Sequence, residues 1–113
     1  NIQCHYGYTQ EDIERVAQTY RDKEIPLDMM MADIEWYQYK CSPTQWNTTN
    51  FPDPEGMIAK LHGLNVRMGV IDDPNVTNAQ PEDYPYGVEN GYFMHSRTGD
   101  QKDIIWPCLR KEP

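Results

Sequence analysis

The clearest pattern along the chain is an apolar stripe that begins after Thr9 and repeats every three to four residues. Its members recur at the spacing of one face of an amphipathic helix, and they are Ile13, Val16, Ala17 and Tyr20. Thr9 supplies a capping hydroxyl at the start, while Pro26 forces Ile25 out of helical geometry. The pattern therefore predicts a helix that starts after Thr9 and ends before Pro26.

A short apolar run from residue 27 to residue 34 follows this helix. It is too short for a typical helix and does not alternate, which is typical of a strand buried on both faces of a parallel sheet. A short buried helical turn is the alternative. The polar and aromatic segment from Glu35 to Asn50 predicts a loop, and its length indicates a role beyond connection.

A second helix and a second strand are predicted after this loop. Asp53 can cap the helix, and Pro54 fits the first helical position. Its apolar face consists of Met57, Ile58, Leu61 and Leu64. Gly63 and Asn65 are residues that commonly end helices. The apolar run from Val66 to Ile71 predicts the second strand.

The predicted order of helix, strand and long loop, repeated twice, is typical of β/α units with parallel strands. Beyond Ile71 the chain is rich in Pro, Gly and Tyr, with at most short strands expected near residues 92–94 and 104–106 and an ordered excursion over residues 75–91. Two parallel strands cannot close a sheet, and an eight-stranded α/β barrel needs about 250 residues. We therefore expect an α/β fold in which residues 1–113 are part of something larger, with no second domain.

Charge and hydropathy exclude two classes of protein. Ten Lys and Arg against 18 Asp and Glu give a net charge of -8, which argues against a nucleic-acid binder held by basic patches. The mean hydropathy is -0.85, and no stretch approaches the roughly 18 apolar residues of a membrane span.

Cysteine, histidine and glycine residues give no cofactor signature. The cysteines are widely spaced and form neither a disulfide framework nor a zinc motif: Cys4, Cys41 and Cys108. Free thiols are expected, with one disulfide plus a spare thiol as the alternative. The histidines lack metal-ligand spacing, and no glycine-rich phosphate loop occurs, so we expect neither a metal nor a cofactor. Two N-glycosylation sequons, at residues 47–49 and 75–77, matter only on a secretory route, so the compartment stays open.

Acidic and aromatic side chains follow each predicted strand. Asp33, Glu35 and Trp36 come after the first, and Asp72 and Asp73 after the second. In α/β folds, sites form at the carboxyl ends of parallel strands. Carboxylates accept hydrogen bonds from sugar hydroxyls while indole rings stack on their C–H faces, so this pattern favours a polyhydroxylated ligand. For Asp72 a turn role is favoured, whereas a carboxylate buried without purpose, as at Asp33, is costly.

A series of motifs in order resembles glycoside hydrolase family 31. The motifs are Gln3–Tyr8, Ile25–Asp28, Ala32–Trp36, Phe51–Pro54, Leu61–His62, Val70–Pro74 and Ile105–Pro107. This family contains α-glucosidases, α-xylosidases, transglycosidases and α-1,4-glucan lyases on a (β/α)8 TIM barrel. The resemblance implies that residues 1–113 are a fragment of this catalytic barrel domain, namely its first two β/α units plus a long following loop.

The resemblance also implies roles for individual residues. Asp33 resembles the family's carboxylate that binds sugar hydroxyls in the -1 subsite, with Ile34 beside it. Ile71 resembles an apolar wall of that subsite, and Trp106 an aromatic that packs against the ring. Asp73 matches a position of mainly architectural role. The two catalytic acids of the family come from later strands, so no catalytic residue is expected in residues 1–113, and this piece alone is expected to be inactive.

The sequence therefore predicts a segment of a retaining α-glycosidase that hydrolyses α-linked glucosides. Its expected partners are an α-glucoside or α-glucan substrate and the remainder of its own polypeptide. An α-1,4-glucan lyase of the same family and a non-catalytic carbohydrate-binding segment are the alternatives. An acidic protein-interaction module fits the composition but explains none of the strand-end residues.

Overall fold

Three parallel strands form the main sheet of the protein. The structure is a computed structural model that describes residues 2–4, 7–39, 42–95 and 97. The strands lie side by side in the order β1 (Ile2–Cys4), β2 (Met29–Ala32) and β5 (Arg67–Val70). Met30 pairs with Ile2 on one side and with Met68 on the other. The sequence predicts β2 and β5 but misses β1, so the prediction of two strands is wrong for the described sheet.

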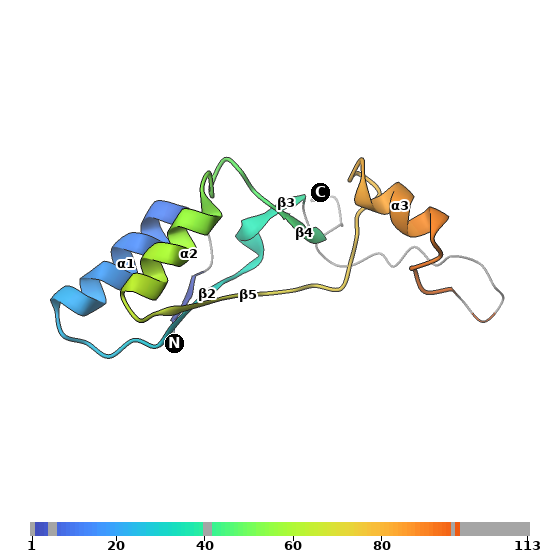
Figure 1. Ribbon diagram of the computed structural model, residues 1–113. Helices are drawn as coiled ribbons and strands as arrows, with labels where there is room; N and C mark the ends of the chain where they lie inside the picture. The colour runs from blue at the N-terminus through green and yellow to red at the C-terminus, as the bar shows by residue number, and fades with distance from the viewer. Residues whose placement is uncertain (1, 5–6, 40–41, 96, 98–113) are drawn as a thin grey trace, which may run out of the picture.

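Two helices connect these strands and cover one face of the sheet. Helix α1 (Gln10–Asp22) links β1 to β2, and α2 (Pro54–Gly63) lies between β2 and β5 in the chain. Both helices lie side by side on the same side of the strands (Figure 1). The core between helices and sheet is apolar, and its fully buried members include Ile13, Ala17, Met30, Met57 and Leu61. The periodicity of the sequence thus correctly predicts an α/β arrangement.

The two faces of β2 differ in burial. Met30 is fully buried against the helices, whereas Met29 and Met31 are only half-buried on the opposite face. Gly69 of β5 pairs with Met31, and a Cβ atom there would lie 2.3 Å from the Cε atom of Met29. Methionine side chains therefore occupy the space that Gly69 leaves open. Within the described residues the helices cover one face of this strand, and the opposite face is half-buried.

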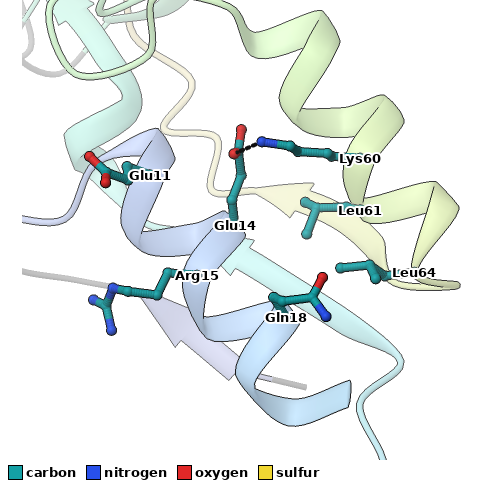
Figure 2. Close-up of a pocket in the computed structure, with 7 residues that line it drawn as sticks. All are labelled: Glu11, Glu14, Arg15, Gln18, Lys60, Leu61 and Leu64. Carbon is teal, nitrogen blue, oxygen red and sulfur yellow. Dashed lines mark hydrogen bonds and ion pairs between the residues drawn. The ribbon is translucent and has the colours of Figure 1, made fainter. Parts of the chain in front are cut away.

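A hollow of about 360 Å³ lies between α1 and α2 (Figure 2). Its lining comes from these helices and the residue after α2: Glu11, Glu14, Arg15, Gln18, Lys60, Leu61 and Leu64. Lys60 Nζ lies 2.5 Å from Glu14 Oε2 and joins the two helices. Burial acts to raise the pKa of Glu14, but hydrogen bonds from Lys60 and Gln10 outweigh it and leave the pKa below its ordinary value. An ion pair thus ties α1 to α2 at the surface.

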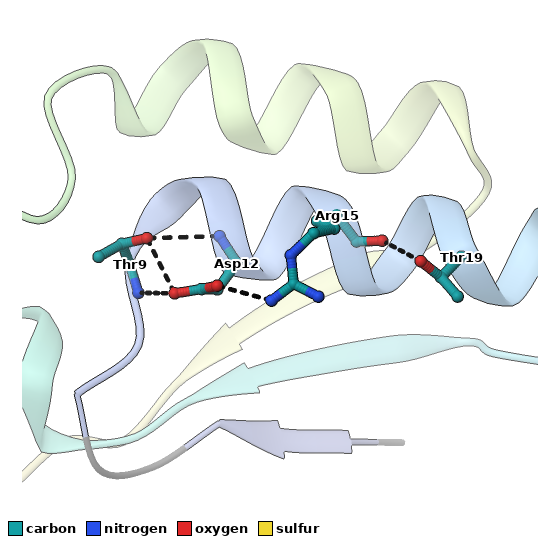
Figure 3. A network of polar contacts seen from close by, with 4 residues as sticks. All are labelled: Thr9, Asp12, Arg15 and Thr19. Atoms are coloured by element: carbon teal, nitrogen blue, oxygen red, sulfur yellow. Dashed lines mark hydrogen bonds and ion pairs between the residues drawn. The ribbon is translucent and has the colours of Figure 1, made fainter.

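Helix α1 begins after Thr9 with the capping hydroxyl that the sequence predicts, here as part of a capping box. Thr9 Oγ1 accepts a hydrogen bond from the Asp12 N–H at 3.4 Å, while Asp12 Oδ2 accepts one from the Thr9 N–H at 3.1 Å (Figure 3). Arg15 Nη2 donates to Asp12 Oδ1 at 2.7 Å. The hydrogen bonds from Arg15 and Thr9 lower the pKa of Asp12. The ionised Asp12 carboxylate therefore stabilises the start of the helix fully above pH 3.8, the ordinary pKa of the group. This stabilisation is lost in stronger acid, as the pH falls through the lowered pKa.

Replacing Thr9 by alanine is expected to destabilise the protein by about 1 kcal/mol, since the Asp12 N–H loses its acceptor, Thr9 Oγ1. The midpoint of urea unfolding measures this loss. Thr9→Ser is the matched control because it keeps the hydroxyl, and it should unfold close to the parent. Equal midpoints for the two variants would show that the cap contributes nothing.

Helix α2 also begins and ends where the sequence predicts. Asp53 Oδ1 accepts from the Gly56 N–H at 3.0 Å, and Pro54 occupies the first turn. The helix ends at Gly63, and Asn65 adopts a left-handed conformation with φ of 53°. The chain can then turn directly into β5.

The segment that the sequence predicts as a polar loop contains ordered structure. After β2 comes the 3-10 helix η1 (Ile34–Trp36), followed by an antiparallel hairpin of β3 (Tyr37–Tyr39) and β4 (Ser42–Trp46). The predicted first strand therefore stops at Ala32, and the alternative of a helical turn applies to its last residue. A seven-residue helix, α3 (Asp83–Glu89), lies within the predicted excursion.

Two further predictions concern the last part of the chain. Residues 92–94 do not form the expected strand. The strand expected at residues 104–106 lies outside the described residues. None of the helices in the described ranges is long and apolar enough to cross a membrane.

Candidate functional site

Asp33 and Ile71 lie next to each other at the carboxyl ends of β2 and β5. They directly follow the register pair Ala32 and Val70. The backbone pairing continues one step further, because the Ile71 N–H donates to the Ala32 carbonyl at 2.8 Å. On the other side, the Asp33 N–H donates to the Cys4 carbonyl at 3.0 Å. The structure thus confirms that these two strand ends meet at one edge of the sheet.

The carboxylate of Asp33 is buried and held on both oxygens. The residue is only 8% exposed. Oδ1 accepts from the Ile34 N–H at 2.8 Å, and Oδ2 accepts from Nε2 of Gln3. The hydroxyl of Tyr8 donates to the Asp33 carbonyl at 2.9 Å and fixes the backbone as well. Both the position and the orientation of this carboxylate are therefore determined by neighbours on β1, η1 and the segment before α1.

The two apolar candidates differ in exposure. Ile34 begins η1 and is 38% exposed, so its side chain is available to a ligand or to another part of the protein. Ile71 is half-buried. Its carbonyl accepts from Trp36 Nε1 at 2.8 Å and from the Tyr37 hydroxyl at 3.3 Å. The end of β5 is thus attached to the segment that follows β2.

Both tyrosines at this edge are neutral donors at physiological pH. Burial, assisted by the negative charges of Asp73 and Asp72, raises the pKa of Tyr37 to about 12. Burial is also the main cause that raises the pKa of Tyr8. The hydrogen bonds to the two strand-end carbonyls therefore persist over the whole physiological pH range.

Trp36 belongs to a buried aromatic cluster. It is 7% exposed, and its ring centroid lies 5.0 Å from that of Tyr37 and 4.9 Å from that of Trp46. Phe51 continues the cluster, 5.4 Å from Trp46 and 5.7 Å from Tyr8. The sequence places Trp36 among the residues that could stack on a ligand. This interpretation is wrong for the described residues, because the indole packs inward and joins the hairpin to the strand ends.

The remaining predicted residues fall into two groups. Asp72 is exposed, and the Asp73 N–H donates to the Tyr37 hydroxyl at 3.1 Å, which fits turn and architectural roles. Trp106 lies outside the described residues, so its predicted role stays a prediction.

A buried polar network, absent from the sequence analysis, connects the hairpin to the excursion after β5. Ser42 and Gln80 are both buried, and Ser42 Oγ donates to Gln80 Oε1 at 2.7 Å. The Gln80 amide nitrogen also donates to Thr44 and Asp83, and the Thr77 N–H donates to Ser42 at 3.4 Å. Two segments that are some 35 residues apart in the chain therefore share one polar core.

The described residues hold no group of three His, Cys, Asp or Glu side chains placed to bind a metal ion. Cys4 is a half-buried free thiol, and burial followed by the charge of Asp12 raises its pKa. Cys41 and Cys108 lie outside the described residues. Among the described groups at this edge, the Asp33 carboxylate is oriented by hydrogen bonds and lies beside Ile34 and Ile71.

Fold and site together define an α/β protein whose polar site lies at the carboxyl ends of parallel strands, as in α/β barrel enzymes. The chain belongs to glycoside hydrolase family 31: the family model described as the glycosyl hydrolases family 31 TIM-barrel domain matches residues 1–111. The resemblance found in the sequence motifs is thereby confirmed.

Curated and solved relatives are glycosidases of the same family. The chain is 31% identical over 110 residues to neutral alpha-glucosidase C of Macaca fascicularis, covering 95% of this chain and 14% of that protein. It is 26% identical to the alpha-xylosidase XylQ of Lactiplantibacillus pentosus, over 88% of this chain and 12% of that one. A family 31 dextranase of Flavobacterium johnsoniae, solved with isomaltotriose, matches with a TM-score of 0.81 and 27% identity, covering 94% of this chain and 13% of the dextranase. The chain thus spans about one seventh of the length of these relatives.

Proposed function

We propose that residues 1–113 are the beginning of the catalytic (β/α)8 barrel of a retaining α-glycosidase that hydrolyses α-linked glucosides. The observation that carries the proposal is the adjacency of Asp33 and Ile71 at one edge of the parallel sheet. Strand ends of this kind form the active site of α/β barrels. The α-glucosidase at 31% identity and the dextranase solved with isomaltotriose support α-linked glucose as the sugar.

In this proposal Asp33 orients the sugar in the -1 subsite. Its two oxygens have about four lone-pair sites, and Gln3 and the Ile34 N–H use two of them. Sugar hydroxyls donate hydrogen bonds to the carboxylate in this orientation. Ile34 and Ile71 form apolar walls that exclude water, and Trp106 packs against the sugar ring.

The two catalytic acids come from the remainder of the polypeptide. A retaining glycosidase uses a nucleophilic carboxylate and an acid/base carboxyl about 5–5.5 Å apart. Asp33 and Asp73 are not this couple in our proposal, because Asp33 binds substrate and Asp73 serves the turn that Tyr37 holds. Residues 1–113 therefore supply substrate contacts, and on their own they are expected to be inactive.

Product analysis of the full-length protein tests this function. We expect an α-glucoside such as maltose to yield glucose, with the α-anomer appearing first in NMR spectra because the mechanism retains configuration. Formation of 1,5-anhydrofructose would identify an α-1,4-glucan lyase instead. Binding of maltose without any product would identify a non-catalytic carbohydrate-binding protein, and release of xylose alone from mixed α-glycosides would change the proposed sugar.

A further inference from the structure

We propose that Gln3 is a positioning residue that holds the carboxylate of Asp33 in its sugar-binding orientation. This inference rests on the proposed function of Asp33 as a substrate contact. Gln3 lies on β1, the strand whose sequence gives no clear pattern.

The parallel register brings Gln3 and Asp33 together. Gln3 pairs with Met31, and Asp33 follows Met31 by two residues. Side chains two residues apart on a strand point to the same face. The Gln3 side chain therefore extends along the sheet toward the carboxyl end of β2, where its Nε2 donates to Asp33 Oδ2.

Gln3 and the Ile34 N–H hold different oxygens of the Asp33 carboxylate. The Ile34 N–H donates to Oδ1, and a hydrogen bond to the other oxygen opposes rotation of the carboxylate about its Cβ–Cγ bond. The second hydrogen bond, from Gln3, fixes the plane of the carboxylate. A neutral amide donor fixes this plane and leaves the formal negative charge of Asp33 for the sugar hydroxyls.

The role of Gln3 can be tested by removing its amide alone. Its side chain is exposed, and among the described residues this is the one hydrogen bond that it makes. A variant without the amide should still fold and lose substrate orientation.

A double-mutant cycle in the full-length enzyme tests the proposal with an activated aryl α-glucoside. Gln3→Met keeps the length of the side chain and removes the donor. We expect it to lower kcat/KM about tenfold in the parent, the size of one lost hydrogen bond to a charged group. The same substitution in an Asp33→Ala background should change kcat/KM less than about twofold, because the two residues act as one unit.

A matched control is available at the exposed surface of α1. Gln18 Nε2 donates to Asp22 Oδ1 at 2.7 Å on the exposed surface, so Gln18→Met removes the same kind of bond away from the strand ends. Gln18→Met should leave kcat/KM unchanged, and thermal unfolding should show that Gln3→Met is folded at the assay temperature, so that its loss of kcat/KM is measured on folded enzyme.

Two results would overturn the role of Gln3 while leaving the proposed function intact. One is an unchanged kcat/KM for Gln3→Met, and the other is an equal loss in the parent and in the Asp33→Ala background. A parent enzyme that cleaves no α-glucoside would instead remove the proposed function, and this inference with it.

Discussion

Alanine at position 33 is expected to lower kcat/KM of the full-length enzyme for an α-glucoside by at least about 100-fold. Asp33 is 8% exposed and held by Gln3 and Ile34, so its carboxylate needs no reorganisation to bind a sugar. A hydrogen bond to a charged group contributes about 1.5–3 kcal/mol, and two such bonds to hydroxyls account for a loss of this size. Steady-state kinetics with an aryl α-glucoside measure it.

Two further variants separate binding from folding at this position. Asp33→Asn keeps an oxygen for the Ile34 N–H and loses the charge, so it should have intermediate activity and the melting temperature of the parent. Asp72→Ala removes an exposed carboxylate at the end of the neighbouring strand and should leave kcat/KM within about twofold of the parent. Full activity of Asp33→Ala would exclude the residue from the sugar site.

The second large effect is expected at Trp36, where alanine should destabilise the protein by about 3–5 kcal/mol. The indole is 7% exposed, packs against Tyr37 and Trp46, and donates to the Ile71 carbonyl at 2.8 Å. Its removal leaves a cavity and weakens the link between the hairpin and β5. The half-life of activity at a fixed elevated temperature measures the loss.

Two aromatic controls belong to this experiment. Trp36→Phe keeps one aromatic ring but loses the N–H donor and part of the indole volume, so its half-life should lie between those of the parent and Trp36→Ala. Tyr92→Ala removes a ring that is 68% exposed, and this variant should lose activity at the same rate as the parent. If Trp36→Ala and Tyr92→Ala inactivated at the same rate, the aromatic cluster would not stabilise the strand ends.

The elements that the sequence predicts correctly are those with local signals. Both helices have a cap and an apolar stripe within about a dozen residues, as at Thr9 and Asp53. Strand β1 has three residues and no period, so it is defined by its pairing with β2, about 28 positions further along the chain. The hairpin is polar in sequence and becomes part of the core only because Phe51 and Trp36 pack on Trp46.

The candidate site divides in the same way. Asp33 and Ile71 follow apolar runs, so their places at strand ends could be predicted. The direction of the Trp36 ring could not, because the 3-10 turn that rotates it inward has no distinct sequence pattern. Gln3 is a polar residue with its partner 30 positions away, and that contact exists only once β1 and β2 are paired.

The buried pair of Ser42 and Gln80 has a consequence for protein engineering. Ser42 and Gln80 are hydrogen-bonded to each other away from water. If the hairpin of a relative were grafted into this protein without that relative's excursion, a buried amide or hydroxyl would be left without a hydrogen-bond partner. Chimeric enzymes intended to exchange substrate preference should therefore transfer residues 37–50 and 72–95 as a matched set.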